Sequence, residues 1–229
     1  MTFSKNDELA VISRYTDKYE KFGYSQKSLG WDKGKQEIRF DILTSEWDFK
    51  NASVLDIGCG FGDFYRFAIE TFGSIGKYTG LEIVPSLIEK GRELYGKDPE
   101  FEIVPGSITE WQPETIYDYV VISGLFNFKL EGGSDDNYEF IDYVLTQAMR
   151  AASGGVAANF LSDNVDYEYE HTFHSNPGRI LQICYGLTRN LILKNDYFPF
   201  EFTVLLNKDD TFDREDTIFT IYKAISAKK

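Results

Sequence analysis

The sequence predicts an α/β fold built on a doubly wound, mostly parallel sheet. From residue 53 onward, short apolar runs alternate with stretches of helical periodicity, a pattern typical of a parallel sheet with helices on both faces. The chain of 229 residues is long enough for one sizeable domain of this class. No internal repeat, low-complexity tract or Pro/Gly-rich linker divides it. We therefore expect one compact unit rather than two.

The region before the first strand has a different pattern. Apolar residues recur at spacings of three and four over Leu9–Phe22, which predicts a helix, and Gly23 interrupts it. A second, shorter helix is predicted over Lys35–Trp47. We expect residues 1–50 to form an N-terminal helical extension or lid, and residues 51–229 to form the main domain.

Eight strands and four helices are predicted after this extension. The helices are Phe61–Phe72, Pro85–Tyr95, Asn137–Arg150 and Pro177–Arg189. The strands are Ser53–Ile57, Tyr78–Glu82, Phe101–Val104, Tyr119–Ser123, Gly155–Leu161, Leu191–Lys194, Phe202–Asn207 and Thr217–Lys223. Because the polar stretch between the last two strands contains no helical pattern, an antiparallel hairpin is expected there.

The composition narrows the classes of partner. The formal net charge is −13 and no basic run is present, so a nucleic-acid partner is disfavoured. The first ten residues are polar, and no apolar run approaches the ~20 residues of a membrane-spanning helix. Neither of the two cysteines has metal-site or CxxC spacing. We expect a soluble, cytoplasmic protein with no membrane partner; a homodimer is one state that the sequence allows.

The strongest motif is Val54–Gly62, VLDIGCGFG, between the first predicted strand and a helix. Glycines there permit a tight turn and let backbone N–H groups approach a ligand. Glu82 ends the next strand, where a carboxylate can accept hydrogen bonds from both ribose hydroxyls of an adenosine group. Two residues distinguish the motif from GxGxxG. Asp63 stands where that pattern requires its third glycine, and Asp56 adds a second carboxylate, which repels a pyrophosphate and suits a cationic ligand.

These residues and three later motifs resemble the class I S-adenosylmethionine-dependent methyltransferases. VLDIGCGFG matches the family's first motif, Gly80–Ile83 its acidic second-strand motif, Gly106–Ile108 the loop beside the adenine, and Tyr117–Ser123 the fourth-strand motif. The resemblance covers roughly half of the chain, from residue 54 to about 161. It implies a Rossmann-like sheet of seven strands, one of them antiparallel, and S-adenosylmethionine as the cofactor.

The resemblance also assigns roles within the motifs. Asp56, Gly58 and Gly60 would hold the methionine part of the cofactor. Glu82 would bind the ribose, and Ser123 would offer its carbonyl to the amino group. Arg39, from the extension, is a candidate partner for the cofactor's carboxylate. The full set of expected cofactor-binding residues is Asp56, Ile57, Gly58, Cys59, Gly60, Glu82, Ile83, Ser107, Ile108, Ser123 and Arg39.

The candidates for catalysis and substrate binding rest on single residues and not on motifs. His171 and His174 follow the fifth strand and are the only histidines; a histidine titrates near neutrality and suits a general base. A solvated surface loop is the alternative reading of both. Candidate substrate contacts are Tyr15, Tyr24, Asn127 and Tyr167. Trp31, Gln36 and Arg39 of the extension could close over the pocket together with Tyr15 and Tyr24, and core packing or surface pairing is the alternative for each. Asp163 and Asn164 are weak evidence for a metal ion, so none is expected.

The acceptor is constrained mainly by what the fourth strand lacks. Val121–Phe126 does not carry the Asn/Asp-Pro-Pro-aromatic signature of methylation at exocyclic amines of bases and at glutamine amides. The expected activity is methyl transfer to a small polar molecule, most simply a hydroxyl of a sugar, a surface-polysaccharide precursor or a natural product. The alternatives are transfer to an amine or carboxylate, a non-catalytic cofactor-binding subunit, and a nicotinamide-dependent oxidoreductase.

Overall fold

The computed structural model describes residues 3–31, 34–111 and 115–226. Its centre is one sheet of seven strands in the order β3-β2-β1-β4-β5-β7-β6. The first five strands pair in parallel, and β7 runs antiparallel to both of its neighbours. The predicted fold class is therefore confirmed. The strands are β1 (Ser53–Ile57), β2 (Lys77–Glu82), β3 (Phe101–Pro105), β4 (Tyr117–Ile122), β5 (Ala152–Leu161), β6 (Leu191–Lys194) and β7 (Glu201–Asn207).

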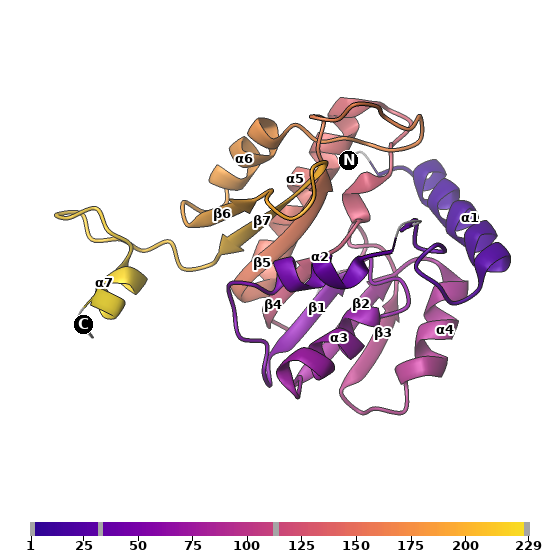
Figure 1. The fold of residues 1–229 in the computed structure, drawn as a ribbon, viewed down its shortest axis with the longest axis horizontal. Helices are drawn as coiled ribbons and strands as arrows, with labels where there is room; N and C mark the ends of the chain where they lie inside the picture. The colour runs from indigo at the N-terminus through magenta and orange to yellow at the C-terminus, as the bar shows by residue number, and fades with distance from the viewer. Residues whose placement is uncertain (1–2, 32–33, 112–114, 227–229) are drawn as a thin grey trace.

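Helices cover both faces of this sheet (Figure 1). One face packs against α5 and α6, and the other against α2, α3 and α4. Helix α1 contacts α4, beside the parallel half of the sheet. The helices are α1 (Lys5–Phe22), α2 (Gln36–Leu43), α3 (Asp63–Phe72), α4 (Pro85–Tyr95), α5 (Ser134–Ala151), α6 (Pro177–Tyr185) and α7 (Thr220–Ser226), with a 3₁₀ turn η1 (Leu125–Asn127).

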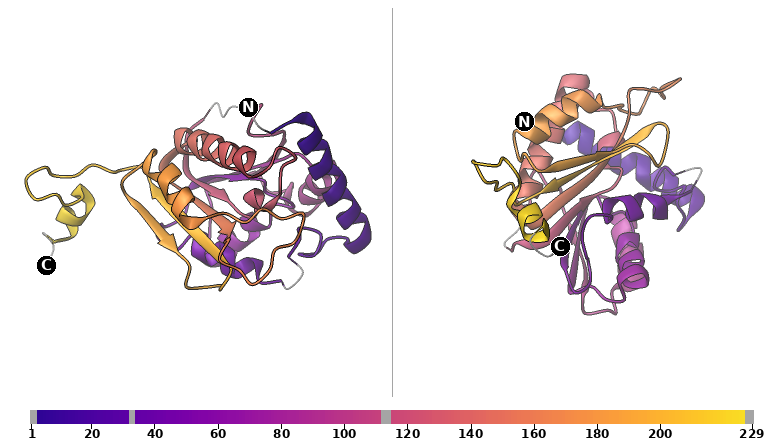
Figure 2. Two further views of the ribbon diagram at one scale, coloured as in Figure 1. Left: turned by 90° about the horizontal axis from the view of Figure 1, so that it is seen from above. Right: turned by 60° about the vertical axis from the view of Figure 1, so that its left-hand side comes forward.

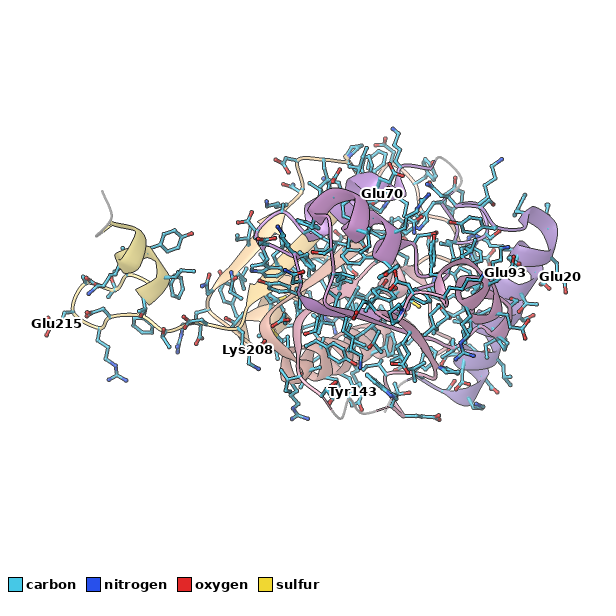
Figure 3. All side chains as sticks on the ribbon, turned by 90° about the horizontal axis from the view of Figure 1, so that it is seen from below. Glu20, Glu70, Glu93, Tyr143, Lys208 and Glu215 are labelled. Atoms are coloured by element: carbon cyan, nitrogen blue, oxygen red, sulfur yellow. The ribbon has the colours of Figure 1, made fainter. Side chains whose placement is uncertain are left out.

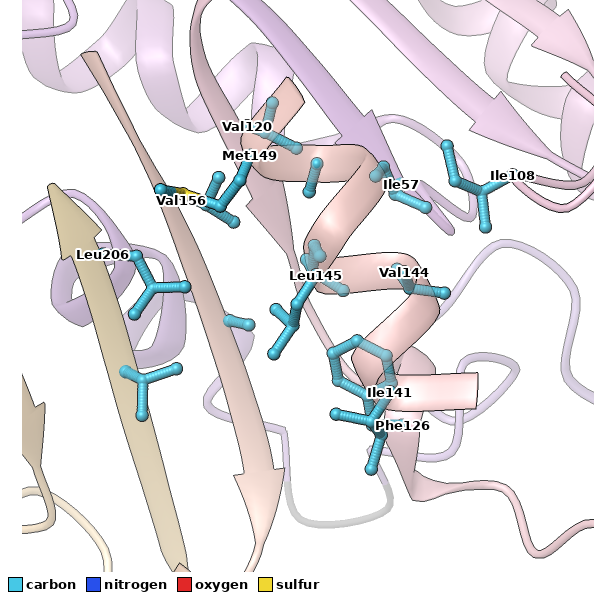
Figure 4. Packing of buried hydrophobic residues seen from close by; sticks show 14 of the residues in the cluster. Ile57, Ile108, Val120, Phe126, Ile141, Val144, Leu145, Met149, Val156 and Leu206 are labelled. Carbon is cyan, nitrogen blue, oxygen red and sulfur yellow. The ribbon is translucent and has the colours of Figure 1, made fainter. Parts of the chain in front are cut away.

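Alternation along the strands produces two separate hydrophobic clusters, one on each face. Val120 and Val156 face α5, whose Ile141 and Leu145 pack against them (Figure 4). Their sequence neighbours Val121 and Ala157 point the other way, toward α2 and α3. On that second face the buried cluster includes Phe40, Leu43, Phe64 and Phe67. Both faces of the sheet are covered by these apolar clusters. The polar cleft described below therefore lies at the carboxyl ends of the strands and not on either face.

The first helix of the N-terminal extension is fixed at its start by local signals and by a long-range contact. Ser4 and Asp7 form a capping box at the start of α1, and Gly23 ends the helix with a φ of 62°. The buried carboxylate of Asp7 also accepts a hydrogen bond from the backbone N–H of Glu131 at 2.9 Å. This contact fixes the start of α1 against the loop that precedes α5.

The end of the chain corrects one expectation. The predicted strand Thr217–Lys223 and its hairpin with residues 202–207 are wrong: residues 220–226 form α7, and β7 pairs with β5 and β6 instead. Because β7 already has a partner on each side, it has no free edge for another strand. Residues 208–210 still hydrogen-bond to β5, to the end of α5 and to the loop before β6, and residues 213–226 lie apart from the rest of the molecule (Figures 1 and 2). Lys223 forms ion pairs with Asp213 and Asp216 within this arm.

The acidic charge is spread over the outer surface. Glu20, Glu70 and Glu93 lie on three different helices and all are exposed (Figure 3). Over the described residues, no helix has the length and apolar character needed to cross a membrane.

Candidate active site

A cleft that is partly open to solvent lies where β1, β2 and β4 end. The carboxyl ends of parallel strands are where open α/β sheets bind ligands. Two opposing sets of residues line this cleft. We call Asp56, Gly58, Gly60 and Glu82 the donor wall, and Leu29, Trp31 and Gln36, which come from the N-terminal extension, the lid wall.

The glycine loop of the donor wall makes a turn that other residues would strain. Gly58 and Gly60 have φ values of 74° and 59°. The N–H of Gly58 donates to the carbonyl of Leu81 at 2.8 Å, which ties the turn to the end of β2. A Cβ on Gly60 would lie 2.9 Å from Cδ2 of Leu29. Gly60 therefore also allows the lid wall to approach the loop closely.

Asp56 places a buried carboxylate directly before this turn. Its side chain is 3% exposed, and Oδ2 accepts a hydrogen bond from the hydroxyl of Tyr78 at 2.7 Å. Burial raises the pKa of Asp56 to about 7; the Tyr78 hydrogen bond opposes the increase, and the nearby carboxylates of Glu82 and Asp63 add to it. No cation is paired with Asp56 among the described residues. The position is thus suited to a cationic ligand group.

Glu82 organises the loop as well as facing the cleft. Its Oε2 accepts from the N–H of Gly60 at 2.8 Å, and its Oε1 accepts from the N–H groups of Ile83 and Val84 at 2.8 and 2.9 Å. Burial raises the pKa of Glu82, and these three backbone hydrogen bonds oppose the increase. A carboxylate oxygen accepts about two hydrogen bonds, so Oε1 is already filled and Oε2 retains capacity for a ligand hydroxyl.

Further polar atoms lie unpaired beside the end of β4. Ser123 lines the cleft, and its buried Oγ has no hydrogen-bond partner within the described part of the chain. The neighbouring N–H of Gly124 donates to Oδ1 of Asn159 at 2.8 Å, while Nδ2 of the same amide is buried and has no partner among the residues that the structure describes. Buried polar atoms without partners are uncommon in proteins. They indicate a site that a polar ligand completes.

The other predicted residues of the donor side line the same cleft. They are Ile57, Cys59, Ile83, Ser107 and Ile108. Ser107 and Ile108 are buried, and the Ser107 hydroxyl is 2.9 Å from that of Thr109. The structure thus brings together every predicted cofactor-binding residue except Arg39, and their roles toward a ligand stay predictions.

Arg39 lies outside the lining, because other groups of this chain occupy its guanidinium. Its Nε donates to Glu201 at 2.8 Å and its Nη2 pairs with the second oxygen of the same carboxylate. The guanidinium also stacks on Trp31, 3.9 Å from the ring centroid, and on Phe198 at 4.8 Å. The carboxylate that Arg39 binds in this structure belongs to β7 and not to a ligand.

The predicted substrate contacts are divided between the cleft and other parts of the molecule. Tyr15 lines the cleft, and burial raises its pKa, with Glu82 contributing. The Tyr24 hydroxyl instead donates to Asp63 at 2.7 Å, tying the extension to α3. Asn127 accepts from the N–H of Leu161 at 3.3 Å and is not part of the lining, and Tyr167 is 58% exposed on a surface loop.

Both histidines also lie outside the lining of the cleft. His174 uses both ring nitrogens within the protein: Nδ1 is 2.8 Å from the carbonyl of Ser162, and Nε2 is 3.1 Å from the hydroxyl of Thr172. His171 is exposed and faces α1, where burial lowers its pKa, with contributions from Arg14 and Lys18. Their predicted role as a base stays a prediction.

The structure describes no group of three or more His, Cys, Asp and Glu side chains placed to hold a metal ion, and the expectation of a metal-free site stays a prediction.

Trp31 and Gln36, which the sequence placed among the residues of the extension that could close over the pocket, line the cleft. Asn159 was not singled out from the sequence as a site residue. Asn159 had a readable signal: it is a polar residue inside the apolar run Val156–Leu161. Such a residue in a buried strand indicates a specific hydrogen-bond partner, which proves to be Gly124.

Comparisons with known proteins agree with this geometry. Residues 54–136 match the model of a family described as "Methyltransferase domain". A protein of Mycobacterium tuberculosis named "Putative methyltransferase Rv1506c" is 23% identical over 159 residues, covering 68% of this chain and 93% of the relative.

Two solved structures show the same fold. Magnesium protoporphyrin IX methyltransferase of Synechocystis PCC 6803, solved with bound SAH, superposes with a TM-score of 0.64 at 10% identity, covering 88% of this chain and 99% of that one. Phosphoethanolamine N-methyltransferase 1 of Haemonchus contortus, in complex with phosphoethanolamine and S-adenosylhomocysteine, also gives a TM-score of 0.64, at 16% identity, covering 98% of this chain and 56% of that one.

Proposed function

We propose that this chain is a class I S-adenosylmethionine-dependent methyltransferase, whose cleft binds S-adenosylmethionine and transfers the methyl group to a small-molecule acceptor, most simply a hydroxyl. The observation that carries this proposal is the pair of buried carboxylates on the donor wall. Asp56 and Glu82 both have raised pKa values, and neither is paired with a cation among the described residues.

The donor wall fits this cofactor group by group. Asp56 supplies negative charge next to the turn, which suits the ammonium of the methionine part. Glu82, held by three backbone N–H groups, presents Oε2 to a ribose hydroxyl. Ile83 and Ile108 offer apolar contact for the adenine. Ser123 follows β4, whose Val121 pairs with Asp56, and it lines the cleft, so that its carbonyl would add a second acceptor for the ammonium.

When bound, the cofactor would supply an electrophilic methyl group to an acceptor oxygen, which would give up its proton, and S-adenosylhomocysteine would be released. The chain's own residues would hold the two reactants in line and limit the access of water. Leu29 and Trp31 would contribute to this limit because they pack against Gly60 and Gly124, over the ends of β1 and β4.

A small acceptor is supported by the position of the lid wall. The extension packs directly on the glycine loop, so the way to the methyl group is a cleft and not an open face. The strongly acidic charge adds to the case against a nucleic acid. A sugar or natural-product hydroxyl is part of this proposal, and an amine acceptor is its alternative.

Transfer of a labelled methyl group from S-adenosylmethionine tests the proposal. The purified chain should methylate members of a panel of small hydroxyl and amine compounds, and Asp56→Asn should abolish the transfer. Leu94→Ala, at an exposed position on α4, is the matched control and should retain it. Binding of S-adenosylhomocysteine without transfer to any compound would favour the non-catalytic alternative. Binding of NAD in its place would contradict the proposal.

A further inference from the structure

The lid wall has a construction of its own that the cofactor does not explain. Trp31 lines the cleft, and the edge of its ring lies against Gly124: a Cβ added there would be 2.7 Å from Cζ2 of the indole. Gly124 directly follows Ser123, so the indole stands beside the expected position of the methionine part. An aromatic side chain at this place contacts whatever approaches the methyl group.

The indole is held in place by Arg39, Phe198 and Glu201, which lie far apart in the sequence and which we call the clamp. The guanidinium of Arg39 covers one face of Trp31 at 3.9 Å and contacts the ring of Phe198 at 4.8 Å. Glu201 binds the guanidinium through both carboxylate oxygens, and the carbonyls of Gly34 and Lys35 accept from its Nη1. Arg39 is 7% exposed, so this charge is buried but fully paired. The clamp leaves Trp31 little freedom to move.

Gln36 provides a polar group on the same wall. It is only 6% exposed, it lines the cleft, and its side-chain amide forms no hydrogen bond with another residue that the structure describes. The amide is not among the described side-chain groups that are both fully buried and unpaired, so it reaches solvent in the cleft and can exchange water for a polar ligand atom. The nearby side chains of Leu125 and Phe128 also line the cleft and are apolar.

We propose that Trp31 and Gln36 form the acceptor subsite, and that it takes a flat, largely apolar ring with one hydrogen-bonding edge, an aromatic hydroxyl, in preference to a sugar. This inference rests on the proposed function and sharpens its acceptor class. The indole and its apolar neighbours match the face of a ring, and the amide of Gln36 matches one heteroatom at its edge. A sugar presents several hydroxyls, each of which needs a partner.

Ligand-observed fluorine NMR tests this without relying on turnover. The probes are 4-fluorophenol and 2-deoxy-2-fluoroglucose, each added to the full chain saturated with S-adenosylhomocysteine. We expect saturable binding of the phenol and none of the sugar. Trp31→Leu should weaken phenol binding about tenfold, since a stacked ring is lost, and Gln36→Met, which keeps the volume, should weaken it a few-fold. Trp47→Phe, outside the cleft lining, is the matched control and should not change it.

Arg39 acts through Trp31 and is a positioning residue. Arg39→Lys keeps the charge but loses the planar fork, so phenol binding should weaken while S-adenosylhomocysteine binding is unchanged. A merely structural role would weaken both together. The matched control is Arg179→Lys, because Arg179 stacks on Tyr138 at 3.8 Å and pairs with Asp135 on the outer surface.

Three results would overturn the inference while the proposed function stands: S-adenosylhomocysteine binds but the phenol does not, the sugar binds more tightly than the phenol, or phenol binding is the same in Trp31→Leu and Gln36→Met as in the unmodified chain. Failure of S-adenosylhomocysteine to bind would overturn the proposed function and this inference together. Both variants can be checked for folding by their S-adenosylhomocysteine affinity, which we expect to be retained.

Discussion

The two walls of the cleft are built in opposite ways. The donor wall is assembled locally: Asp56, Gly60 and Glu82 come from two adjacent strands and the turn between them, and Glu82 bonds the loop only 22 residues before it. The lid wall depends on distant pairs, and the hydrogen bond from Arg39 to Glu201 joins residues 162 apart. The donor wall contains two carboxylates, whereas the lid wall contains no charged residue and one aromatic ring, that of Trp31. The comparison suggests that the fold fixes the donor site by itself, whereas the acceptor side depends on how the chain ends are held.

The largest effect should come from Glu82. Glu82→Ala removes the expected ribose contact and leaves the N–H groups of Gly60, Ile83 and Val84 without their acceptor. We expect S-adenosylhomocysteine binding to weaken by about 1.5–3 kcal/mol in calorimetry, the range for a hydrogen bond to a charged group. Glu93→Ala, at an exposed position on α4, is the control. Equal affinity in the two variants would show that the donor wall does not bind the ribose.

Asp56 should make cofactor binding depend on pH. Because the pKa of Asp56 is raised to about 7, its carboxylate loses charge as the pH falls through 7, and affinity for a ligand ammonium should fall with it. Asp56→Asn should bind weakly at every pH. Calorimetric titrations between pH 6 and pH 8.5 distinguish the two, and a pH-independent affinity in the unmodified chain would contradict the assignment.

The raised pKa of Asp56 also predicts how the stability of the ligand-free protein depends on pH. Stability should fall as pH rises, whereas ligand affinity should rise. The folded pKa lies above the ordinary value of 3.8, so the unfolded chain loses this proton first as pH rises. The ligand-free protein should therefore lose stability between about pH 4 and pH 7. Asp56→Asn, which cannot ionise, should raise the Tm above pH 7 by about 3 °C. A lower Tm in the variant at pH 8 would show that the charged carboxylate is stabilised by a group outside the contacts described above.

A smaller effect should couple the two walls. Gly60→Ala forces a Cβ toward Leu29 at a positive φ, and should lower the free energy of unfolding by about 1–2 kcal/mol. Adding Leu29→Ala relieves the steric part but not the backbone strain, so the double variant should be less destabilised than the sum of the single changes. Urea unfolding of the four proteins measures this. Strict additivity would mean that the lid wall does not touch the loop in solution.

The smallest effect is expected for the histidines. Since neither His171 nor His174 lines the cleft, replacing both by alanine should leave S-adenosylhomocysteine affinity within about twofold. Turnover in the same variant tests their predicted role as a base. Unaltered turnover at saturating acceptor would exclude that role, and a large loss with unaltered cofactor affinity would place the loop of residues 163–176 at the acceptor.

The sequence predicts the donor half because its signals are local. VLDIGCGFG and Glu82 sit on one strand–turn–helix unit and the next strand, and their positions follow from strand periodicity alone. The pattern also located the seven strands of the sheet, but it added an eighth, because Thr217–Lys223 is apolar enough to resemble a strand; the count of seven was what the resemblance implied. The partner of Arg39 could not be predicted. Arg39 pairs with Glu201 because β7 lies between β5 and β6 in the sheet. The position of β7 depends on contacts between distant segments, so the local sequence does not predict it.

Calorimetric titration of the unmodified chain with S-adenosylhomocysteine at pH 8, with NAD as the parallel ligand, tests the central claim most directly. If the cleft at the ends of β1, β2 and β4 binds the cofactor through the donor wall, S-adenosylhomocysteine binds with one site per chain and NAD does not bind. Binding of NAD without S-adenosylhomocysteine, or of neither ligand, would contradict it.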